Sequence, residues 1–355
     1  QRRNPLGAAW QGIWNRRARR ALEQILAELP HEATIVHFHQ WTKALSPSVL
    51  LAPLRFGLPA VASLHDYFIA CPNGAYYHFP KSTPCKLSPL SPACVAANCD
   101  SRGYAYKIVR VLRQWATAVA LRRAGESLRM LSVSPFAERV IERFLPPPHA
   151  RFVVRSPIDV GRHVPVAVAE NSDFVFVGRL TEEKGVRLLA EVARDAGLPL
   201  TIVGDGPLLD MLRQVDGTVR FTGWLDAAGV DAVMRKARAL VFPSTWYENG
   251  GLVVFEALAQ GVPAIVSRTT APADFIVDGV NGYVVDAGDR AQLLDRMRRL
   301  SDGAAAARLG AEAYRRYWDQ PQTAEAHTRD LLAIYRTVLT QHAVQLHAVP
   351  SPAVP

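Results

Sequence analysis

Two glutamates on either side of a glycine pair are the residues of this 355-residue chain with the clearest chemistry. In VFPSTWYENGGLVVFEALAQGVPAIV (241–266), Glu248 and Glu256 flank Gly250 and Gly251, and the pattern predicts a strand, a loop, a helix and a second strand. The unpaired N–H groups of a first helical turn attract phosphate, and glycine lets a ligand approach the backbone. A carboxylate one turn further on, Glu256, can accept hydrogen bonds from ribose hydroxyls. Phosphate, ribose and a further polyol near Glu248 together predict a nucleotide-sugar site.

Two cations upstream complete this predicted site. Arg179 and Lys184 lie five positions apart on the loop after an expected strand at 173–178. Arginine binds phosphate as a two-pronged donor and lysine as a point charge, and each charge-assisted hydrogen bond is worth about 1.5–3 kcal/mol. The helix dipole disfavours cations at a helix start, so a surface role explains them less well than a diphosphate does. We expect the backbone N–H groups of the two glycines and Leu252 to cradle phosphate, with Gly204 in a turn beside the base.

These segments resemble retaining family 4 glycosyltransferases, the glycosyl transferases group 1, which have the GT-B fold. The resemblance rests on the Glu-x7-Glu spacing, on FVFVGRLTEEKGVRLLAEVA (174–193), and on VGDGP (203–207) and FTGWL (221–225), which follow in the family's order. It covers nearly the whole chain and is strongest from Phe174 to Val285. It implies an α/β protein of two Rossmann-like parallel-sheet domains facing across a cleft.

The resemblance also implies an activity. It implies a hexosyltransferase that moves a sugar from a UDP- or GDP-linked donor to a glycan or lipid-linked acceptor, with retention of configuration and without a required metal ion. Arg179 and Lys184 would stabilise the leaving diphosphate, and Glu248 would contact the donor sugar. His65, at the end of the expected strand 59–65, would hydrogen-bond a donor hydroxyl or support positive charge through its backbone carbonyl. From the residues alone, Glu248 as a solvated carboxylate and His65 as a hydrogen-bonded core histidine stay open.

Two other functions stay open at this point. A nucleotide-sugar 2-epimerase has the same architecture but needs no acceptor. A non-catalytic basic scaffold that binds anionic polymer or membrane would fit the charge of the first half. Intact Arg179, Lys184 and Glu256 argue against the scaffold, because a protein without a donor does not need a diphosphate site.

The charge is unevenly distributed along the chain. Residues 1–155 carry 21 Lys and Arg against 8 Asp and Glu, whereas the formal charge of the whole chain is only +9. A basic half favours an anionic acceptor or an anionic membrane surface, and surface arginines that only keep this half soluble are an equally open interpretation. No nucleic-acid partner is expected. The amphipathic stretch 15–29 fits a membrane-surface helix or a helix that packs on the core with a solvated basic end. The sequence shows no signal peptide and no apolar run of about 20 residues, so we expect a cytoplasmic protein, peripheral at most on the inner membrane face.

Four cysteines fall within a short segment. Cys71, Cys85, Cys94 and Cys99 have the spacing C-x13-C-x8-C-x4-C, which matches no compact zinc pattern. Free thiols, a metal site and a disulfide pair all stay open. We assign no metal to the donor site itself.

The domain organisation follows from the alternation of strands and helices. We expect an acceptor-binding domain at 1–156, a linker at 157–171 and a nucleotide-sugar-binding domain at 172–325. A helix at 326–342 would return to the first domain, and a Pro-rich tail at 343–355 would be disordered. The family begins with a strand and a glycine-rich loop that this sequence does not contain, so the first domain is expected to be truncated.

The expected elements can be given as ranges. Strands are expected at 33–39, 59–65, 130–134, 151–156, 173–178, 199–204, 219–223, 239–244, 263–267 and 282–285. Helices are expected at 14–29, 101–124, 135–144, 290–300, 304–318 and 328–339.

Overall fold

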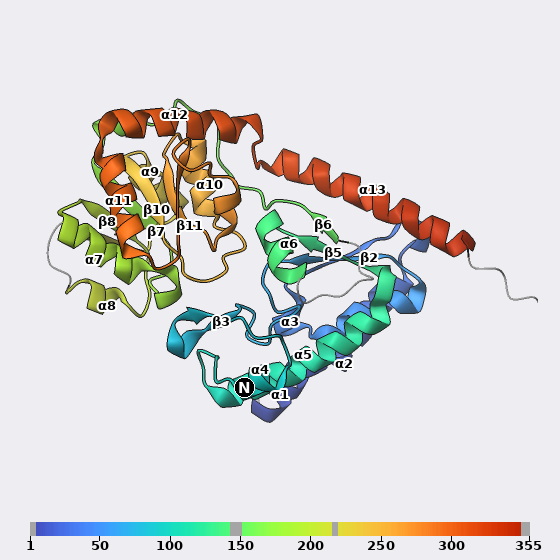
Figure 1. Cartoon of the computed structure of the whole chain (residues 1–355). Helices are drawn as coiled ribbons and strands as arrows, with labels where there is room; N and C mark the ends of the chain where they lie inside the picture. Colours follow the sequence, from blue (N-terminus) through green and yellow to red (C-terminus); the bar gives the residue numbers. More distant parts are fainter. Residues whose placement is uncertain (1–4, 143–150, 215–218, 349–355) are drawn as a thin grey trace, which may run out of the picture. The chain divides into compact units, whose positions relative to one another are not determined.

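The chain forms two compact units, shown in Figure 1. The computed structural model describes residues 5–142, 151–214 and 219–348. Unit 1 holds the described residues of Gln1–Lys81, Cys85–Arg155 and His327–Pro355. Unit 2 holds those of Ser82–Pro84 and Ser156–Ala326.

A parallel sheet forms the centre of unit 1. Among the described residues it has four strands in the order β1-β2-β5-β6. The strands are β1 (Val36–His39), β2 (Ala60–Leu64), β5 (Leu128–Ser132) and β6 (Arg151–Val153). Every residue of β2 and β5 is buried, as expected for parallel strands covered on both faces. Two short strands, β3 (Tyr77–His78) and β4 (Thr83–Pro84), pair separately.

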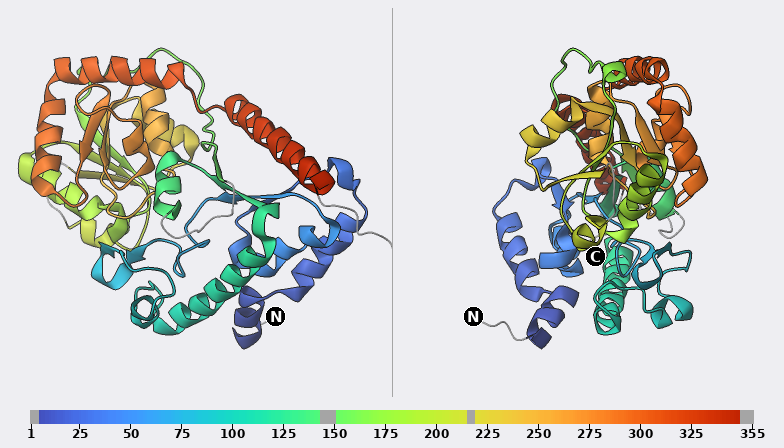
Figure 2. Two further views of the ribbon diagram at one scale, coloured as in Figure 1. Left: turned by 45° about the vertical axis from the view of Figure 1, so that its right-hand side comes forward. Right: turned by 90° about the vertical axis from the view of Figure 1, so that its left-hand side faces the viewer.

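Helices surround the sheet of unit 1. They are α1 (Pro5–Ile13), α2 (Arg16–Ala27), α3 (Trp41–Ala44), α4 (Pro92–Ala96), α5 (Tyr104–Ala124), α6 (Pro135–Glu142) and α13 (Ala324–Ala348). Figure 2 shows α5 and α13 as single long helices. The sequence did not predict α1. In α2, Leu26 is buried and Ile25 is 58% exposed, so one face of this helix packs against unit 1 and the other faces solvent.

The last helix, α13, belongs to unit 1 from His327 onward. Its Val338 is fully buried beside Val61, Leu131 and Val154 of the sheet region. The helix continues to Ala348, which corrects the prediction that disorder starts at residue 343. The rest of that predicted tail lies outside the described residues.

Unit 2 is built on a larger parallel sheet. In the described part of the chain this sheet has six strands in the order β12-β11-β10-β7-β8-β9. The strands are β7 (Asp173–Val177), β8 (Leu200–Val203), β9 (Val219–Gly223), β10 (Ala237–Phe242), β11 (Ala264–Ser267) and β12 (Gly282–Val285). The chain proceeds from β7 through β8 to β9 on one side, then crosses to β10 on the other side of β7. The strand order therefore reverses between β7 and β10.

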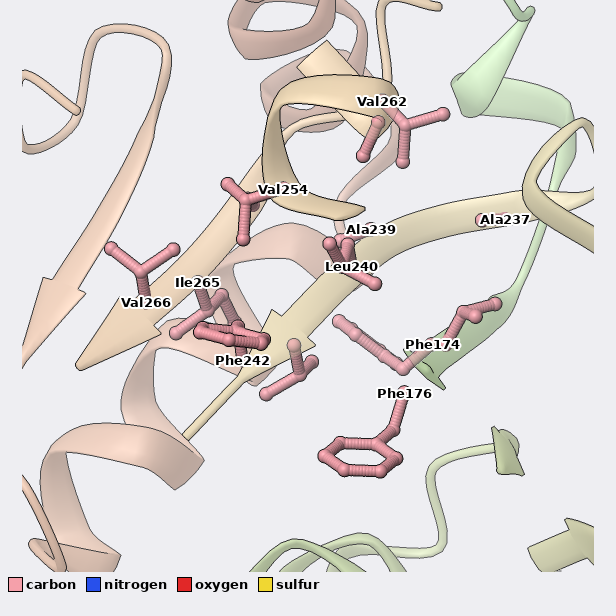
Figure 3. Close-up of a cluster of buried hydrophobic side chains, with 14 of the residues drawn as sticks. Phe174, Phe176, Ala237, Ala239, Leu240, Phe242, Val254, Val262, Ile265 and Val266 are labelled. Carbon is pink, nitrogen blue, oxygen red and sulfur yellow. The ribbon is translucent and has the colours of Figure 1, made fainter. Parts of the chain in front are cut away.

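Helices cover this sheet and close a continuous hydrophobic core. They are α7 (Val186–Ala196), α8 (Leu209–Leu212), α9 (Ala227–Met234), α10 (Leu252–Ala259), α11 (Arg290–Ser301) and α12 (Gly303–Asp319). Figure 3 shows part of this core, with Phe174, Phe176 and Leu240 from the central strands in one cluster with Val254 of α10 and Ile265 of β11. All five are almost completely buried, so α10 is firmly anchored on the strands that precede and follow it. The prediction of an α/β protein with parallel sheets is confirmed.

The segment predicted as a linker packs on unit 2. The Ile158 N–H donates to the Gln322 carbonyl at 2.8 Å, and the Val166 N–H donates to the Gln260 carbonyl at 2.8 Å. Val168 and Ile158 join the hydrophobic core of the same unit. Alternating apolar residues in this stretch, without a helical period, therefore reflect an extended strap that is fixed along its length.

No helix of the described residues is both long enough and apolar enough to cross a membrane.

Candidate functional site

The loop after β7 is held in place by its contact with the loop after β10. A short 3-10 turn, Glu182–Lys184, leads to Gly185, which has φ +69° and precedes α7. A Cβ on Gly185 would lie 2.1 Å from the Pro243 carbonyl oxygen, so only glycine allows the two loops this close. The Thr245 N–H adds a 2.8 Å hydrogen bond to the Glu183 carbonyl. Both loops are therefore positioned as one structure.

Lys184 and Glu248 form an ion pair across these two loops. Their side chains are only 13% and 12% exposed, so the pair is mostly removed from water. The Trp246 indole N–H donates to the same Glu248 oxygen at 2.9 Å, and the Lys184 ammonium lies 5.1 Å from the Trp246 ring centroid. The Glu248 backbone is fixed as well, since its N–H donates to the Thr269 carbonyl. Lys184 and Glu248 were predicted as separate ligand contacts, whereas the structure pairs their charges with each other.

Arg179 is in a different situation. Its side chain is 68% exposed, and its closest carboxylate, that of Glu183, is 4.0 Å away. An exposed ion pair at that distance contributes little to stability. The guanidinium therefore keeps its donors available for an anionic ligand.

The start of α10 has the features of an anion site. Gly251 has φ +68°, and a Cβ there would lie 2.8 Å from Pro272 Cγ. A Cβ on Gly250, by contrast, would meet open space. Among the described residues no side chain caps this helix. Its first N–H groups and the positive end of its dipole are thus left for a ligand, beginning at Leu252, whose residue is 37% exposed.

Glu256 lies one turn inside α10 and is half-buried. Burial raises the pKa of its carboxyl above the usual value for glutamate. Within the described ranges the carboxyl has neither a hydrogen bond nor an ion pair. A partly desolvated carboxylate without a partner is unfavourable, so its presence points to a hydroxyl-bearing ligand.

Packing between two loops explains why position 204 is a glycine. A Cβ on Gly204, at φ +136°, would lie 1.9 Å from the Gly178 carbonyl oxygen. The Leu180 N–H donates to the Asp205 carbonyl at 2.9 Å, which joins the turn after β8 to the loop after β7. Gly204 therefore lets one loop support the other, and through it the position of Arg179.

All these residues lie at one edge of the unit 2 sheet. Arg179 and Lys184 follow β7, Gly204 follows β8, and Glu248 follows β10, and these strands are parallel neighbours. Ligands of open α/β sheets bind outside the carboxyl ends of the strands where the strand order reverses. The predicted residues occupy that point, between β7 and β10.

Comparisons with known proteins agree with this geometry. Residues 162–316 match the family described as "Glycosyl transferases group 1". The chain is 30% identical over 313 residues to the glycogen synthase of Mycobacterium tuberculosis, covering 81% of this chain and 73% of that protein. The chain belongs to the glycosyl transferases group 1 family.

Solved structures identify the fold of this glycosyltransferase as GT-B. Sucrose-phosphate synthase from Thermosynechococcus elongatus matches with a TM-score of 0.66 and 19% identity, over 91% of this chain and 77% of that one. Anabaena HepE in complex with UDP matches with a TM-score of 0.62 and 16% identity, over 94% and 82% of the two chains. The predicted family and fold class are confirmed.

In unit 1 of the glycosyltransferase, His65 belongs to a cluster of three histidines. His39 Nδ1 and His65 Nε2 are 2.9 Å apart, and the two rings stack. His37 contacts Ser63 Oγ at 2.8 Å and the Tyr335 hydroxyl of α13 at 2.5 Å. Burial, together with a smaller effect of the neighbouring imidazoles, lowers the pKa of His37 to about 4. Burial likewise lowers the pKa of His39 and of His65. A neutral His65 can donate or accept a hydrogen bond.

Sequence reasoning missed two residues of the loops after β7 and β10. Trp246 was not singled out, although it stands two positions before Glu248 and its N–H could have been expected to reach a carboxylate. Gly185 was read as part of a family signature, while its function is the close approach to Pro243. No pattern in the sequence reveals that Lys184 and Glu248 pair, because they lie 64 positions apart.

Proposed function

We propose that this glycosyltransferase transfers a hexosyl group from a UDP- or GDP-linked sugar to a hydroxyl of a glycan or lipid-linked acceptor, with retention and without a metal ion. The observation that carries the proposal is the uncapped start of α10 together with the exposed Arg179, which follow the neighbouring strands β10 and β7 where the strand order reverses. Such a site suits a diphosphate, which carries the charge that both features attract. The UDP complex of Anabaena HepE supports a nucleotide donor.

The donor would be held by three kinds of contact. The diphosphate binds the Arg179 guanidinium and the backbone N–H groups of Gly250, Gly251 and Leu252. The ribose hydroxyls donate to the Glu256 carboxylate, which otherwise has no described partner. Gly250 lets the diphosphate approach the backbone, because nothing occupies the space that its Cβ would fill.

Lys184 and Glu248 would act when the glycosidic bond to the diphosphate breaks. Negative charge then builds on the departing phosphate oxygens and positive charge on the sugar ring. The Lys184 ammonium is already desolvated beside Trp246, so it stabilises the negative charge on the phosphate more strongly than it could in water. Glu248 accepts hydrogen bonds from sugar hydroxyls, and His65 supports the sugar through its ring or its backbone carbonyl. The acceptor hydroxyl attacks the face from which the diphosphate leaves, which retains the configuration.

Calorimetry tests the donor site. Wild type is titrated with UDP, GDP and ADP beside Arg179→Ala, and Arg187→Ala is the matched control because its exposed guanidinium pairs with Glu182 on the same segment. Losing one charge-assisted bond of about 1.5–3 kcal/mol weakens binding roughly 10- to 100-fold in Arg179→Ala only. Failure of a folded wild type to bind any nucleotide, or equal losses in both variants, contradicts the site.

Product analysis tests the reaction. With the nucleotide that binds, the corresponding donor sugars are incubated with and without glycan acceptors, in the presence of EDTA. An α-linked product from an α-linked donor, formed with EDTA present, supports retention and metal independence. Conversion of the donor into its 2-epimer without acceptor supports the epimerase function instead.

A further inference from the structure

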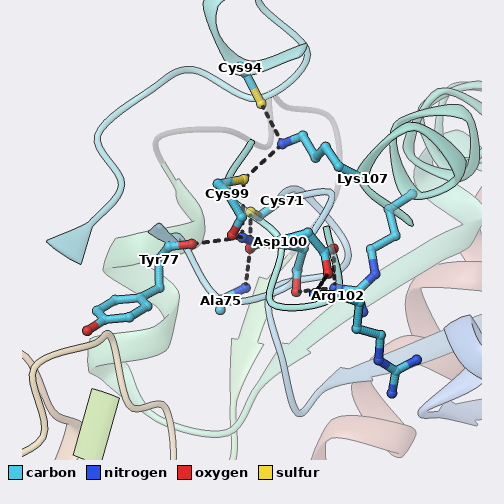
Figure 4. A network of polar contacts seen from close by, with 10 residues as sticks. Cys71, Ala75, Tyr77, Cys94, Cys99, Asp100, Arg102 and Lys107 are labelled. Atoms are coloured by element: carbon cyan, nitrogen blue, oxygen red, sulfur yellow. Dashed lines mark hydrogen bonds and ion pairs between the residues drawn. The ribbon is translucent and has the colours of Figure 1, made fainter. Parts of the chain in front are cut away.

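A lysine buried among cysteines lies in unit 1, apart from the donor residues. Lys107, in the first turn of α5, has no exposed surface. Its ammonium nitrogen lies 3.1 Å from Cys99 Sγ and 3.7 Å from Cys94 Sγ, and Figure 4 shows it between the two sulfurs. The nearby carboxylate of Asp100 pairs with Arg110 at 2.9 Å instead. The two sulfurs are therefore the partners that the structure gives to this buried charge.

A buried ammonium requires a compensating negative charge. Burial lowers the pKa of Lys107, but the hydrogen bond to Cys99 and the neighbouring thiol groups outweigh burial, so the net shift is upward. Cys99 Sγ also faces the Asn73 side-chain N–H at 3.4 Å. Cys99 Sγ thus faces a cationic and a neutral donor, and it is the closer of the two sulfurs to the Lys107 nitrogen, so Cys99 is the natural partner of Lys107.

Cys94 and Cys99 can also reach each other. Both sulfurs neighbour the same nitrogen, so their separation cannot exceed the two nitrogen–sulfur distances laid end to end. Cys94 belongs to the five-residue helix α4, and Cys99 follows three residues after its end, so only a short stretch of chain separates the two cysteines. In the described residues, no group of three or more His, Cys, Asp or Glu side chains is arranged to hold a metal ion. The position between these sulfurs is taken by an amine nitrogen instead.

We propose that Cys94 and Cys99 form an oxidation site for peroxides, in which Cys99 attacks, Cys94 resolves and Lys107 transfers the protons. The site lies outside the donor-binding residues, and the inference does not depend on the proposed transferase reaction.

The steps balance. The Cys99 thiolate attacks one oxygen of hydrogen peroxide, forming an S–O bond and breaking the O–O bond, and the departing hydroxide takes a proton from Lys107 to become water. The neutral Lys107 amine then removes the proton from Cys94. Cys94 attacks Cys99, an S–S bond forms, the S–O bond breaks, and a second hydroxide leaves as water with the same proton. The products are a disulfide, two waters and a neutral amine, which suits a buried position without an anion.

The other two cysteines give a contrasting expectation. Burial raises the pKa of Cys71 to about 11 and also raises the pKa of Cys85. Cys85 is nevertheless the most exposed of the four, whereas Cys99 is only 3% exposed. If exposure governs reactivity, Cys85 reacts first; if the charge of Lys107 governs it, Cys99 does.

The experiment treats the reduced full chain with one equivalent of hydrogen peroxide, followed by rapid alkylation and peptide mapping without reductant. The expected first product links Cys94 to Cys99 with the loss of two hydrogen atoms. Lys107→Met is expected to slow its formation at least tenfold, while Cys85→Ser, the matched control, reacts at the wild-type rate. In Cys94→Ser, a dimedone adduct is expected at Cys99.

Three results would overturn the proposal. The first is oxidation of Cys85 before the other cysteines in wild type, a measurement that stands even if Lys107→Met fails to fold. The second is an unchanged rate in a folded Lys107→Met protein. The third is one equivalent of zinc in the purified chain that is released on oxidation, which would make the sulfurs metal ligands.

Discussion

Replacing Glu256 by glutamine should weaken nucleotide binding without lowering the stability of unit 2. The carboxyl is half-buried, its pKa is raised by burial, and the described residues give it no partner. In the apo protein its charge is therefore unfavourable, and a neutral amide of the same shape removes that penalty. With nucleotide bound as proposed, the same charge would accept hydrogen bonds from the ribose. Stability and affinity should thus respond to one substitution in opposite directions.

The size of the binding effect follows from the hydrogen bonds exchanged. A bond to a charged group is worth about 1.5–3 kcal/mol and a neutral one about 0.5–1.5, so Glu256→Gln should lose about 1–2 kcal/mol, or roughly 5- to 30-fold in Kd. Thermal unfolding should occur at or above the wild-type Tm. The pH dependence of stability has a defined sign, because the pKa of Glu256 is raised in the folded state. Below the ordinary glutamate pKa of 4.5, burial of this carboxyl costs no stability, and the cost grows as pH rises toward the folded pKa. Glu256→Gln should therefore be more stable than wild type only above pH 4.5.

Calorimetry and differential scanning fluorimetry measure both quantities. Glu170→Gln is the matched control, because Glu170 is an exposed glutamate of the same unit. This substitution should change neither nucleotide affinity nor Tm. The reasoning is refuted if Glu256→Gln binds nucleotide within twofold of wild type. It is also refuted if the variant unfolds several degrees earlier, since that would show that the carboxylate supports the apo fold.

Three further substitutions test other parts of the structure. Lys184→Met should lower the free energy of unfolding of unit 2 by about 2–3 kcal/mol. This is less than the loss expected for a fully buried pair, because both side chains retain some exposure. In denaturant unfolding, adding Glu248→Gln to Lys184→Met should recover more than half of the lost free energy. Gly204→Ala should cost more than about 2 kcal/mol because its Cβ meets a carbonyl, while Gly223→Ala, with open space at φ +74°, should cost about 1 kcal/mol in the same assay. His37, whose folded pKa of about 4 lies below the ordinary 6.5, should lose stability as pH falls through that window, and His37→Gln should abolish that part of the pH dependence of Tm.

The sequence predicted the strands of unit 2 well because parallel strands are continuous apolar runs that end at glycine or polar turns. The start of β10 is an instructive exception: the strand was expected from 239 and begins at Ala237. The charged Arg238 lies inside the strand and is buried, and its guanidinium donates to the carbonyls of Asn171, Leu300 and Ser301. A charged residue fits inside a strand when distant carbonyls satisfy it, and no local pattern shows this.

The candidate site shows the same division between local and distant information. Glycine spacing and residue type were sufficient to predict the loop-to-helix turn at Gly251 and the position of Glu256 one turn inside the helix, because both depend only on the neighbouring backbone. The state of each charged group was not predictable. Whether Lys184 is exposed or paired depends on a loop that follows another strand, and only the sheet order brings the two loops together.

This difference in state separates the two cations that the sequence treated as equivalent. Arg179 is exposed and weakly paired, so binding a diphosphate displaces little more than water, and its contribution should be felt when the donor associates. Lys184 is desolvated and already neutralised by Glu248, so a ground-state phosphate gains little from it. In the proposed reaction its charge would become available only as Glu248 turns to the sugar and the leaving phosphate becomes more negative. In the proposed reaction, Arg179 would capture the donor and Lys184 would act in the transition state. Binding and catalysis would then be divided between them, because an interaction that strengthens only as the bond breaks accelerates the reaction without tightening the ground state.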